Sequence, residues 1–465
     1  MSAEPFDMIV IGSGPAGQKA AIQASNNGRR VVLIEKTRQL GGGCVQRGTI
    51  PSKTLRENAL RVRNMRKNAE LANFQLPEQI ELSTLIDRLG EVVKAHDSYM
   101  RRQLDRSKVL LLHGRAHFIS KNQLQVEQVN GVKQRLQSDI IIIATGSKPR
   151  QPENIAVDHE HILDSDSILS MLYIPKSLTV LGGGVIASEY ASIFQTLGVA
   201  VTMVDKYPRP LGFLDEDLSS AFIDAFTSMG GKWIGNTEVA RAYWNDIDLV
   251  VTECEDGRSV TSEKLLCAAG RIANVENLAI ANAGLSLNNH GLIAVDENLQ
   301  TDVMGVFAAG DVIGPPSLAS ASMEQGRRAS RNSLGVQVGR ISATIPTGIY
   351  SIPELSSVGL SETQARKIHG KVLVGKASFD EVARGQISGD LNGMLKIVCD
   401  EAGQKVLGVM AMGEGATELI HIGQMALLAE ANVDIFVETI FNFPTLAEAY
   451  RIAALEVIYA RENNP

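Results

Sequence analysis

Two glycine-rich turns in this sequence have the spacing that binds a dinucleotide. The first, GSGPAG, follows the apolar run Phe6–Ile11, and the second, GGGVIA, follows Leu178–Leu181. In each turn the first glycine permits a tight bend, the second lets the backbone approach a pyrophosphate, and the third small residue lets the next helix pack on the strand. The residues at these positions are Gly12, Gly14 and Gly17 in the first turn and Gly182, Gly184 and Ala187 in the second.

An acidic residue ends the strand that follows each of these turns. The run Val31–Ile34 leads into Glu35, and Val199–Val204 leads into Asp205. A carboxylate about 20 residues beyond the glycines can accept a hydrogen bond from a ribose hydroxyl. Because the unit of strand, turn, helix, strand and acid occurs twice, the sequence predicts two dinucleotide sites.

Asp205 also bears on which dinucleotide the second site prefers. A carboxylate there accepts hydrogen bonds from a ribose 2′-hydroxyl, which favours NAD(H), and it repels a 2′-phosphate. Lys206 and Arg209 follow closely. Two interpretations stay open: the cations supply counter-charge for a phosphate, or they are ordinary surface charges.

Composition places the chain among large proteins that do not bind nucleic acid, membranes or metals. Its 465 residues are enough for about three domains. The net charge of −7 comes without a long basic run, and no stretch approaches the roughly 20 apolar residues of a membrane helix. Four scattered cysteines lack metal-type spacing, and no basic leader precedes the first strand, so we expect a cytoplasmic protein.

A third stretch, GGGCVQRGTIPSK, holds further residues that could do chemistry. It resembles the active-site segment of the flavin-dependent pyridine nucleotide-disulphide oxidoreductases. In most of that family two cysteines five positions apart carry electrons away from the flavin as a dithiol. Here Cys44 stands at the first position and Thr49 at the second. A hydroxyl cannot form a disulphide, while Lys53 remains where the family sets a positive charge beside the flavin.

A second departure from the family pattern lies near the C-terminus. The stretch FNFPTLAEAY resembles the family's His-Pro-Thr-x-x-x-Glu element, whose histidine moves protons to and from the thiols. Phe443 stands at the histidine position and cannot transfer a proton, although Pro444, Thr445 and Glu448 remain. His421 is the nearest alternative base, and it fits an interface or surface histidine better.

The resemblance covers nearly the whole chain and implies its architecture. We expect an α/β fold with two Rossmann-type dinucleotide-binding domains, for FAD and NAD(P), and a C-terminal α+β dimerisation domain. The expected boundaries are 1–150 for the first part of the FAD domain, 151–272 for the NAD(P) domain, 273–344 for the second part of the FAD domain and 345–465 for the interface domain. The interface domain completes the partner subunit's active site in the family, so a homodimer or a higher homo-oligomer is implied.

The resemblance also implies roles for individual residues. Lys53 would pair with Glu189 near the flavin N5 and tune the flavin's potential, which makes this pair the expected catalytic residues. Asp311 would bind the ribityl hydroxyls, and the helix that begins at Leu318–Ala321 would direct N–H groups at the flavin O2. The expected cofactor-binding residues are Gly12, Ser13, Gly14, Pro15, Ala16, Gly17, Glu35, Lys36, Gly42, Gly43, Cys44, Lys53, Gly114, Ala116, Ala144, Thr145, Gly146, Gly182, Gly184, Val185, Ile186, Glu189, Asp205, Lys206, Val239, Gly270, Arg271, Gly310, Asp311, Leu318, Ala319 and Ser320.

Thr49 and Phe443 replace the residues that the family uses to reduce a disulphide. The residues expected to bind the flavin and the nicotinamide nucleotide are unaffected. With DSDSILSM at 164–171 and GDVIGPPSLASA, the chain is most similar to the transhydrogenase branch of the family. That resemblance implies a Si-specific, FAD-dependent exchange of hydride between NADPH and NAD⁺, or NADP⁺ and NADH.

Three other functions stay open at this point. An NAD(P)H-dependent reductase could pass electrons to a quinone, a dye or oxygen, with Cys44 cycling through a sulfenic acid. A flavoprotein that has lost catalysis could serve as a binding or structural subunit. A disulphide reductase is the remaining alternative, and it lacks a second cysteine near Cys44 in sequence.

Overall fold

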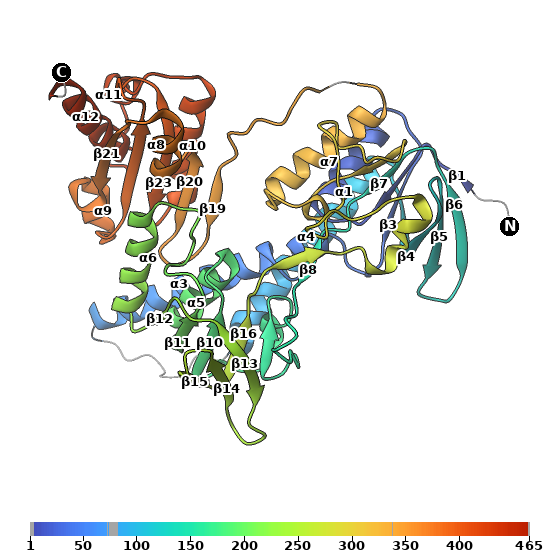
Figure 1. Ribbon diagram of the computed structural model, residues 1–465, viewed down its shortest axis with the longest axis horizontal. Coiled ribbons are helices and arrows are strands. Elements are labelled where there is room, and N and C mark those ends of the chain that lie inside the picture. The colour runs from blue at the N-terminus through green and yellow to red at the C-terminus, as the bar shows by residue number, and fades with distance from the viewer. Residues whose placement is uncertain (1–3, 72, 74–81, 337, 464–465) are drawn as a thin grey trace.

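The computed structural model describes residues 4–71, 73, 82–336 and 338–463. Figure 1 shows three groups of elements: blue, teal and yellow elements around one sheet, green elements around a second, and orange to red elements around a third. Among the described helices, none combines the length and apolar character needed to cross a membrane. The described residues also include no group of three or more histidine, cysteine or carboxylate side chains that could hold a metal ion.

The first sheet is built from segments far apart in the chain. In sheet order its strands are β1 (Glu4–Pro5), β6 (Lys133–Gln137), β5 (Gln123–Gln128), β4 (Leu110–Ser120), β3 (Val31–Glu35), β2 (Met8–Ile11), β7 (Ile141–Ile143) and β18 (Val306–Ala308). The five strands from β4 to β18 run parallel. The strands β2, β3, β7 and β18 are completely buried, as expected for parallel strands covered on both faces. Helices α1 (Pro15–Asn26) and α7 (Ala319–Ser333) pack against each other beside this sheet (Figure 1).

The second sheet repeats the parallel pattern. In sheet order its strands are β12 (Lys232–Ile234), β11 (Ala200–Val204), β10 (Ser177–Leu181), β16 (Lys264–Cys267) and β9 (Ile162–Asp164). Helices α5 (Val185–Thr196) and α6 (Glu216–Ser228) follow β10 and β11, and the antiparallel strands β13 (Val239–Trp244), β14 (Val250–Cys254) and β15 (Ser259–Ser262) form a separate small sheet. The chain crosses from the first sheet to the second at β8 (Ser147–Pro149) and returns at β17 (Arg271–Ala273). These two short strands pair in antiparallel fashion, so the two crossings lie side by side.

The third sheet is antiparallel throughout. In sheet order its strands are β19 (Thr347–Ile349), β20 (Leu355–Gly359), β23 (Val406–Met412), β22 (Met394–Cys399) and β21 (Leu373–Ser378). Its helices are α8 (Glu362–His369), α9 (Ala383–Ser388), α10 (Ala416–Leu428), α11 (Ile435–Glu438) and α12 (Glu448–Asn463). Two sheets with parallel strands at their centre and one antiparallel sheet with helices confirm the predicted fold class. The predicted domain boundaries stay a prediction.

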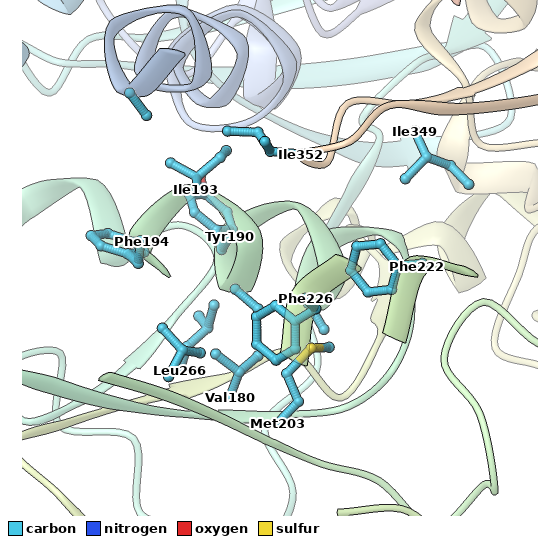
Figure 2. Close-up of a cluster of buried hydrophobic side chains, with 14 of the residues drawn as sticks. Val180, Tyr190, Ile193, Phe194, Met203, Phe222, Phe226, Leu266, Ile349 and Ile352 are labelled. Carbon is cyan, nitrogen blue, oxygen red and sulfur yellow. The ribbon is translucent and has the colours of Figure 1, made fainter. Parts of the chain in front are cut away.

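Three helices lie between β3 and β4 in the chain, and one of them contacts the second sheet's elements. They are α2 (Gly42–Gln46), α3 (Thr49–Leu71) and α4 (Leu82–Arg106). Helix α3 contacts α5 of the second sheet, and its Leu55 joins the same buried cluster as Val180 and Phe194. Figure 2 shows that cluster, in which Ile349 and Ile352 of the C-terminal part lie beside α5. One apolar core therefore holds α3, the second sheet and the start of the third sheet together.

A buried lysine joins the second and third sheets. Lys396 on β22 is only 2% exposed, and its Nζ lies 3.0 Å from Asp215, 3.0 Å from Asp217 and 2.7 Å from Glu362. Burial opposes the ionisation of Asp217, but hydrogen bonds from Lys376 and Lys396 outweigh it and hold the pKa of Asp217 below its ordinary value. Asp217 is therefore ionised at neutral pH, and Lys396 supplies counter-charge to the cluster.

We expect Lys396→Met to destabilise the protein by about 3–5 kcal/mol, because the substitution leaves the buried Asp215 carboxylate without its cation. Lys376→Met is the matched control: Lys376 also contacts Asp217, at 2.7 Å, but it is half exposed, so its loss should cost about 1 kcal/mol or less. Urea unfolding followed by circular dichroism measures both. Equal midpoints for the two variants would contradict the larger contribution expected of the buried lysine.

Candidate active site

The first glycine turn forms a cradle between β2 and α1. Gly12 has a φ of 101°, and a Cβ on it would lie 2.4 Å from the carbonyl oxygen of Ala144. A Cβ on Gly17 would lie 1.8 Å from the carbonyl oxygen of Gly12, so only glycine fits at either position. Gly14 differs, because no atom lies within 4 Å of its added Cβ. The open space at Gly14, in front of the N-terminal N–H groups of α1, fits a pyrophosphate.

Further polar groups around this cradle suit a bound dinucleotide. The Thr145 hydroxyl, in the first crossing, is buried and has no hydrogen-bond partner among the described residues. The Asp311 carboxylate accepts a hydrogen bond from the Ser147 hydroxyl at 2.7 Å, which leaves its other oxygen available. The first site therefore fits FAD, which the sequence predicts for it.

Glu35 has more partners than the sequence predicts. Its Oε2 accepts hydrogen bonds from the Ser13 backbone N–H at 3.0 Å and from the Ser13 hydroxyl at 2.7 Å. Its Oε1 accepts from the Thr37 backbone N–H at 2.9 Å and from the Thr37 hydroxyl at 3.0 Å. These four bonds use the four lone-pair sites of a carboxylate. A ribose hydroxyl would therefore bind Glu35 by displacing one of the two side-chain hydroxyls.

Lys53 and Glu189 meet between the two parallel sheets. Lys53 lies on α3 and Glu189 on α5, and the Lys53 Nζ lies 2.8 Å from both carboxylate oxygens of Glu189. The carboxylate is 5% exposed and the lysine 25%, so the pair is shielded from water on the glutamate side. The predicted pairing is present in the structure, and the catalytic role of the two residues stays a prediction.

Cys44 lies on α2 as an isolated thiol. None of the chain's four cysteines forms a disulphide, and the other three are buried. Burial raises the pKa of the Cys44 thiol, and a hydrogen bond from Thr49 and the charge of Lys53 offset that rise only in part. The thiol is therefore neutral at pH 7, which suppresses nucleophilic and redox chemistry there.

The second glycine turn, between β10 and α5, has the same shape. Gly182 has a φ of 113°, a Cβ on it would lie 2.8 Å from the Ala268 carbonyl oxygen, and no atom lies within 4 Å of a Cβ on Gly184. The Asp205 carboxylate lies against this turn, because a Cβ on Gly183 would come within 2.7 Å of its Oδ2. This site too leaves room for a pyrophosphate, with a carboxylate beside it.

The two cations that follow Asp205 already have carboxylate partners. Lys206 lies 3.9 Å from Glu238, and Arg209 forms a salt bridge with Glu216. Both salt bridges are largely exposed, so the cations are held only weakly. The structure leaves both interpretations of these cations open.

Arg271 ties the two crossings to residues that the sequence did not single out as site residues. Its guanidinium donates to the Ser147 hydroxyl and carbonyl oxygen, both at 2.9 Å, and to the Ser165 hydroxyl at 2.9 Å. Asp166 lies 3.3 Å from Arg271 and 3.4 Å from Arg47, which follows α2. Ser165 and Asp166 lie in the segment DSDSILSM at 164–171, which carries part of the family resemblance but was not predicted to be part of a site.

Comparisons with known proteins agree with this geometry. Residues 6–326 match the model of the pyridine nucleotide-disulphide oxidoreductases, and residues 345–454 match the dimerisation domain of the same proteins. The chain belongs to the pyridine nucleotide-disulphide oxidoreductase family.

Curated relatives within the family share about 40% of their residues with the chain. The soluble pyridine nucleotide transhydrogenase of Mycobacterium bovis is 41% identical over 461 residues, which is 97% of both chains. The proteins of the same name from Pseudomonas savastanoi and Marinobacter nauticus are 40% and 38% identical, and each match covers 98% of this chain and 98% or more of theirs.

Solved structures of the family have the same fold. LpdA from Mycobacterium tuberculosis superposes with a TM-score of 0.89 at 26% identity, covering 96% of this chain and 99% of its own. The HOCl-induced flavoprotein disulphide reductase RclA from Escherichia coli, as its Cu(II) complex, also gives 0.89, at 27% identity, covering 98% and 99%.

The remaining predicted residues lie on or next to the strands and helices named above. Gly42 and Gly43 begin α2, Gly114 and Ala116 lie on β4, and Lys36 directly follows β3. Others begin α5, follow β18 or begin α7; they are Val185, Ile186, Gly310, Leu318, Ala319 and Ser320. Val239 begins β13, Ala144 and Gly146 flank Thr145, and Gly270 precedes β17. Their contacts with a cofactor stay predictions.

Phe443 and His421 lie on the third sheet's domain. Phe443 is 75% exposed in the single chain. His421 is exposed on α10, with its Nδ1 2.9 Å from the Gln424 side-chain oxygen. Exposure and a local partner suit the interpretation of His421 as a surface or interface residue.

The open space at Gly14 and Gly184 allows the two sites to be tested separately. We expect Gly14→Ala to fold but to lose bound FAD, because the methyl group fills the first cradle. Gly184→Ala should keep FAD and bind NAD⁺ about tenfold more weakly. The measurements are the flavin-to-protein absorbance ratio and a fluorescence titration with NAD⁺.

Gly90→Ala on α4 is the matched control, since no atom lies within 4 Å of its added Cβ and it is remote from both turns in sequence. It should retain both FAD and NAD⁺ binding. Loss of FAD from Gly184→Ala and not from Gly14→Ala would show that the two sites are assigned the wrong way round.

Proposed function

We propose that this protein is a Si-specific, FAD-dependent transhydrogenase, which exchanges hydride between NADPH and NAD⁺ and between NADP⁺ and NADH. The observation that carries the proposal is a pair of open dinucleotide cradles together with a cysteine, Cys44, that forms no disulphide and has Thr49 at the position of the family's second cysteine. Relatives about 40% identical over nearly their full length are named soluble pyridine nucleotide transhydrogenase, which supports the same function.

The first cradle would hold FAD, through Gly14 and α1 at the pyrophosphate, Asp311 at the ribityl chain and the N-terminus of α7 near the ring. The second cradle would hold NAD(H) or NADP(H), one after the other, through Gly184 and Asp205. When bound, FAD supplies the chemistry of hydride acceptance and donation. No dithiol follows it in this chain.

The chain's own residues set the conditions for that chemistry. Glu189 holds the Lys53 ammonium between the two sites through two contacts of 2.8 Å, so a positive charge is available where electron density increases. Thr49 cannot accept electrons, and the neutral Cys44 thiol is a poor nucleophile. Hydride that enters from one nicotinamide therefore leaves most simply to another.

The family's C-terminal domain supports a homo-oligomer, for which a homodimer is the simplest form. Large apolar side chains on that domain are exposed in the single chain, among them Ile440 at 94% and Phe443 at 75%. A second copy of the chain would cover such residues. The domain boundaries given above and a cytoplasmic location belong to the same proposal.

Stopped-flow spectroscopy tests the exchange directly. We expect NADPH to bleach the absorbance of the bound flavin, and an oxidised NAD analogue to restore it faster than air or a quinone does, because the second cradle would bind the analogue. Restoration by a quinone but not by the NAD analogue would favour the NAD(P)H-dependent reductase instead. A flavin that NADPH cannot bleach would indicate a protein without catalytic activity.

A further inference from the structure

One short segment of the C-terminal domain contacts both helices that carry the Lys53–Glu189 pair. We call Tyr350–Ile352, between β19 and β20, the brace segment. Ile349 and Ile352, at and beside its ends, pack into the buried cluster around α5 (Figure 2). Apolar burial of these two side chains therefore anchors the brace segment, independently of its hydrogen bonds.

On the α5 side the brace segment binds Glu189 itself. The backbone N–H of Tyr350 donates to Glu189 Oε1 at 2.9 Å. One helical turn further along, the Ser192 hydroxyl accepts a hydrogen bond from the Ile352 backbone N–H at 2.9 Å. Residues three apart lie on the same face of a helix, so the segment runs along one face of α5 and fixes the glutamate from outside the helix.

On the α3 side the same segment binds the residue one turn beyond Lys53. The Arg56 guanidinium is buried, and its Nε donates to the Ser351 carbonyl oxygen at 3.1 Å. Its charge is balanced by Glu354, just beyond the segment, at 3.0 Å. The brace segment thus binds α3 and α5 next to the Lys53–Glu189 pair and holds the two helices at a fixed distance there.

The Tyr350 side chain also faces the pair. The Lys53 Nζ lies 4.8 Å from the centroid of the Tyr350 ring, which is cation–π range. Burial raises the pKa of the Tyr350 phenol, so the ring stays neutral. Lys53 is therefore held by a carboxylate and an aromatic face together, and both are fixed by the brace segment.

We propose that Tyr350 is a positioning residue for the reaction: its ring orients the Lys53 ammonium, and its backbone orients Glu189, for action on the flavin. The role of the pair rests on the proposed function, whereas the geometry of the brace does not. Because Tyr350 belongs to the domain of the third sheet, that domain contributes to the flavin site within a single chain.

Substitutions of the ring separate positioning from general stability. Tyr350→Phe keeps the aromatic face and the backbone N–H, and Tyr350→Leu keeps only the N–H. We expect Tyr350→Leu to change the absorption band of bound FAD, to lower its midpoint potential and to slow bleaching by NADPH about fivefold, with the KM for NADPH unchanged. Tyr350→Phe should match the wild type in all these measurements.

The matched control is Tyr243→Leu, because Tyr243 also faces a cation, Arg241 at 4.9 Å, but lies on the separate sheet of β13 and β14. It should leave the FAD band and the bleaching rate unchanged. Ser192→Ala serves as a second variant, since it removes a brace contact without touching the ring, and it should slow bleaching in the same direction.

Two results would overturn the positioning role: a Tyr350→Leu protein with an unchanged FAD band and bleaching rate, or a Tyr350→Phe protein impaired as much as Tyr350→Leu. These readouts need no second nucleotide. If the wild type is bleached by NADPH but not restored by NAD⁺, the transhydrogenase function fails while the role of Tyr350 is still decided.

Discussion

A single salt bridge, Lys53 to Glu189, is the contact on which the rest of this site depends. It joins a helix that follows the first glycine cradle to a helix that begins at the second, so it fixes one dinucleotide site against the other. A charge pair this shielded is stable only where geometry and further hydrogen bonds satisfy it. The bond from the Tyr350 backbone and the Tyr350 ring supply that support.

Other salt bridges also join parts of the chain that lie far apart in the sequence. Arg271 and Asp166 join the crossings to α2, Arg56 and Glu354 join α3 to the third sheet, and Lys396 joins the third sheet to α6. Each joint pairs a cation with carboxylates from another part of the chain, at sites where the apolar core is interrupted. The cradles for two dinucleotides are thus held in position by these salt bridges together with the apolar core shared by α3, the second sheet and the start of the third sheet.

Local patterns in the sequence were enough to predict the cradles. Spacing and strand context identified Gly14 and Gly184, because the geometry of a glycine turn is set within a few residues. The contacts of Tyr350, Asp166 and Lys396 could not be predicted, because each includes a partner more than 100 positions away and no motif names that partner. Glu35 shows the limit of a motif: its position was predicted, but its four bonds to Ser13 and Thr37 were not.

The most direct test of a hydride path without a sulfur relay is steady-state exchange between NADPH and thio-NAD⁺ by a Cys44→Ser variant, normalised to its FAD content. Serine keeps an oxygen that can form a hydrogen bond with Thr49, but a hydroxyl cannot undergo the redox chemistry of a thiol. We predict a kcat within about twofold of the wild type. A loss of roughly a hundredfold or more, with FAD still bound, would contradict this account and return the thiol to the reaction.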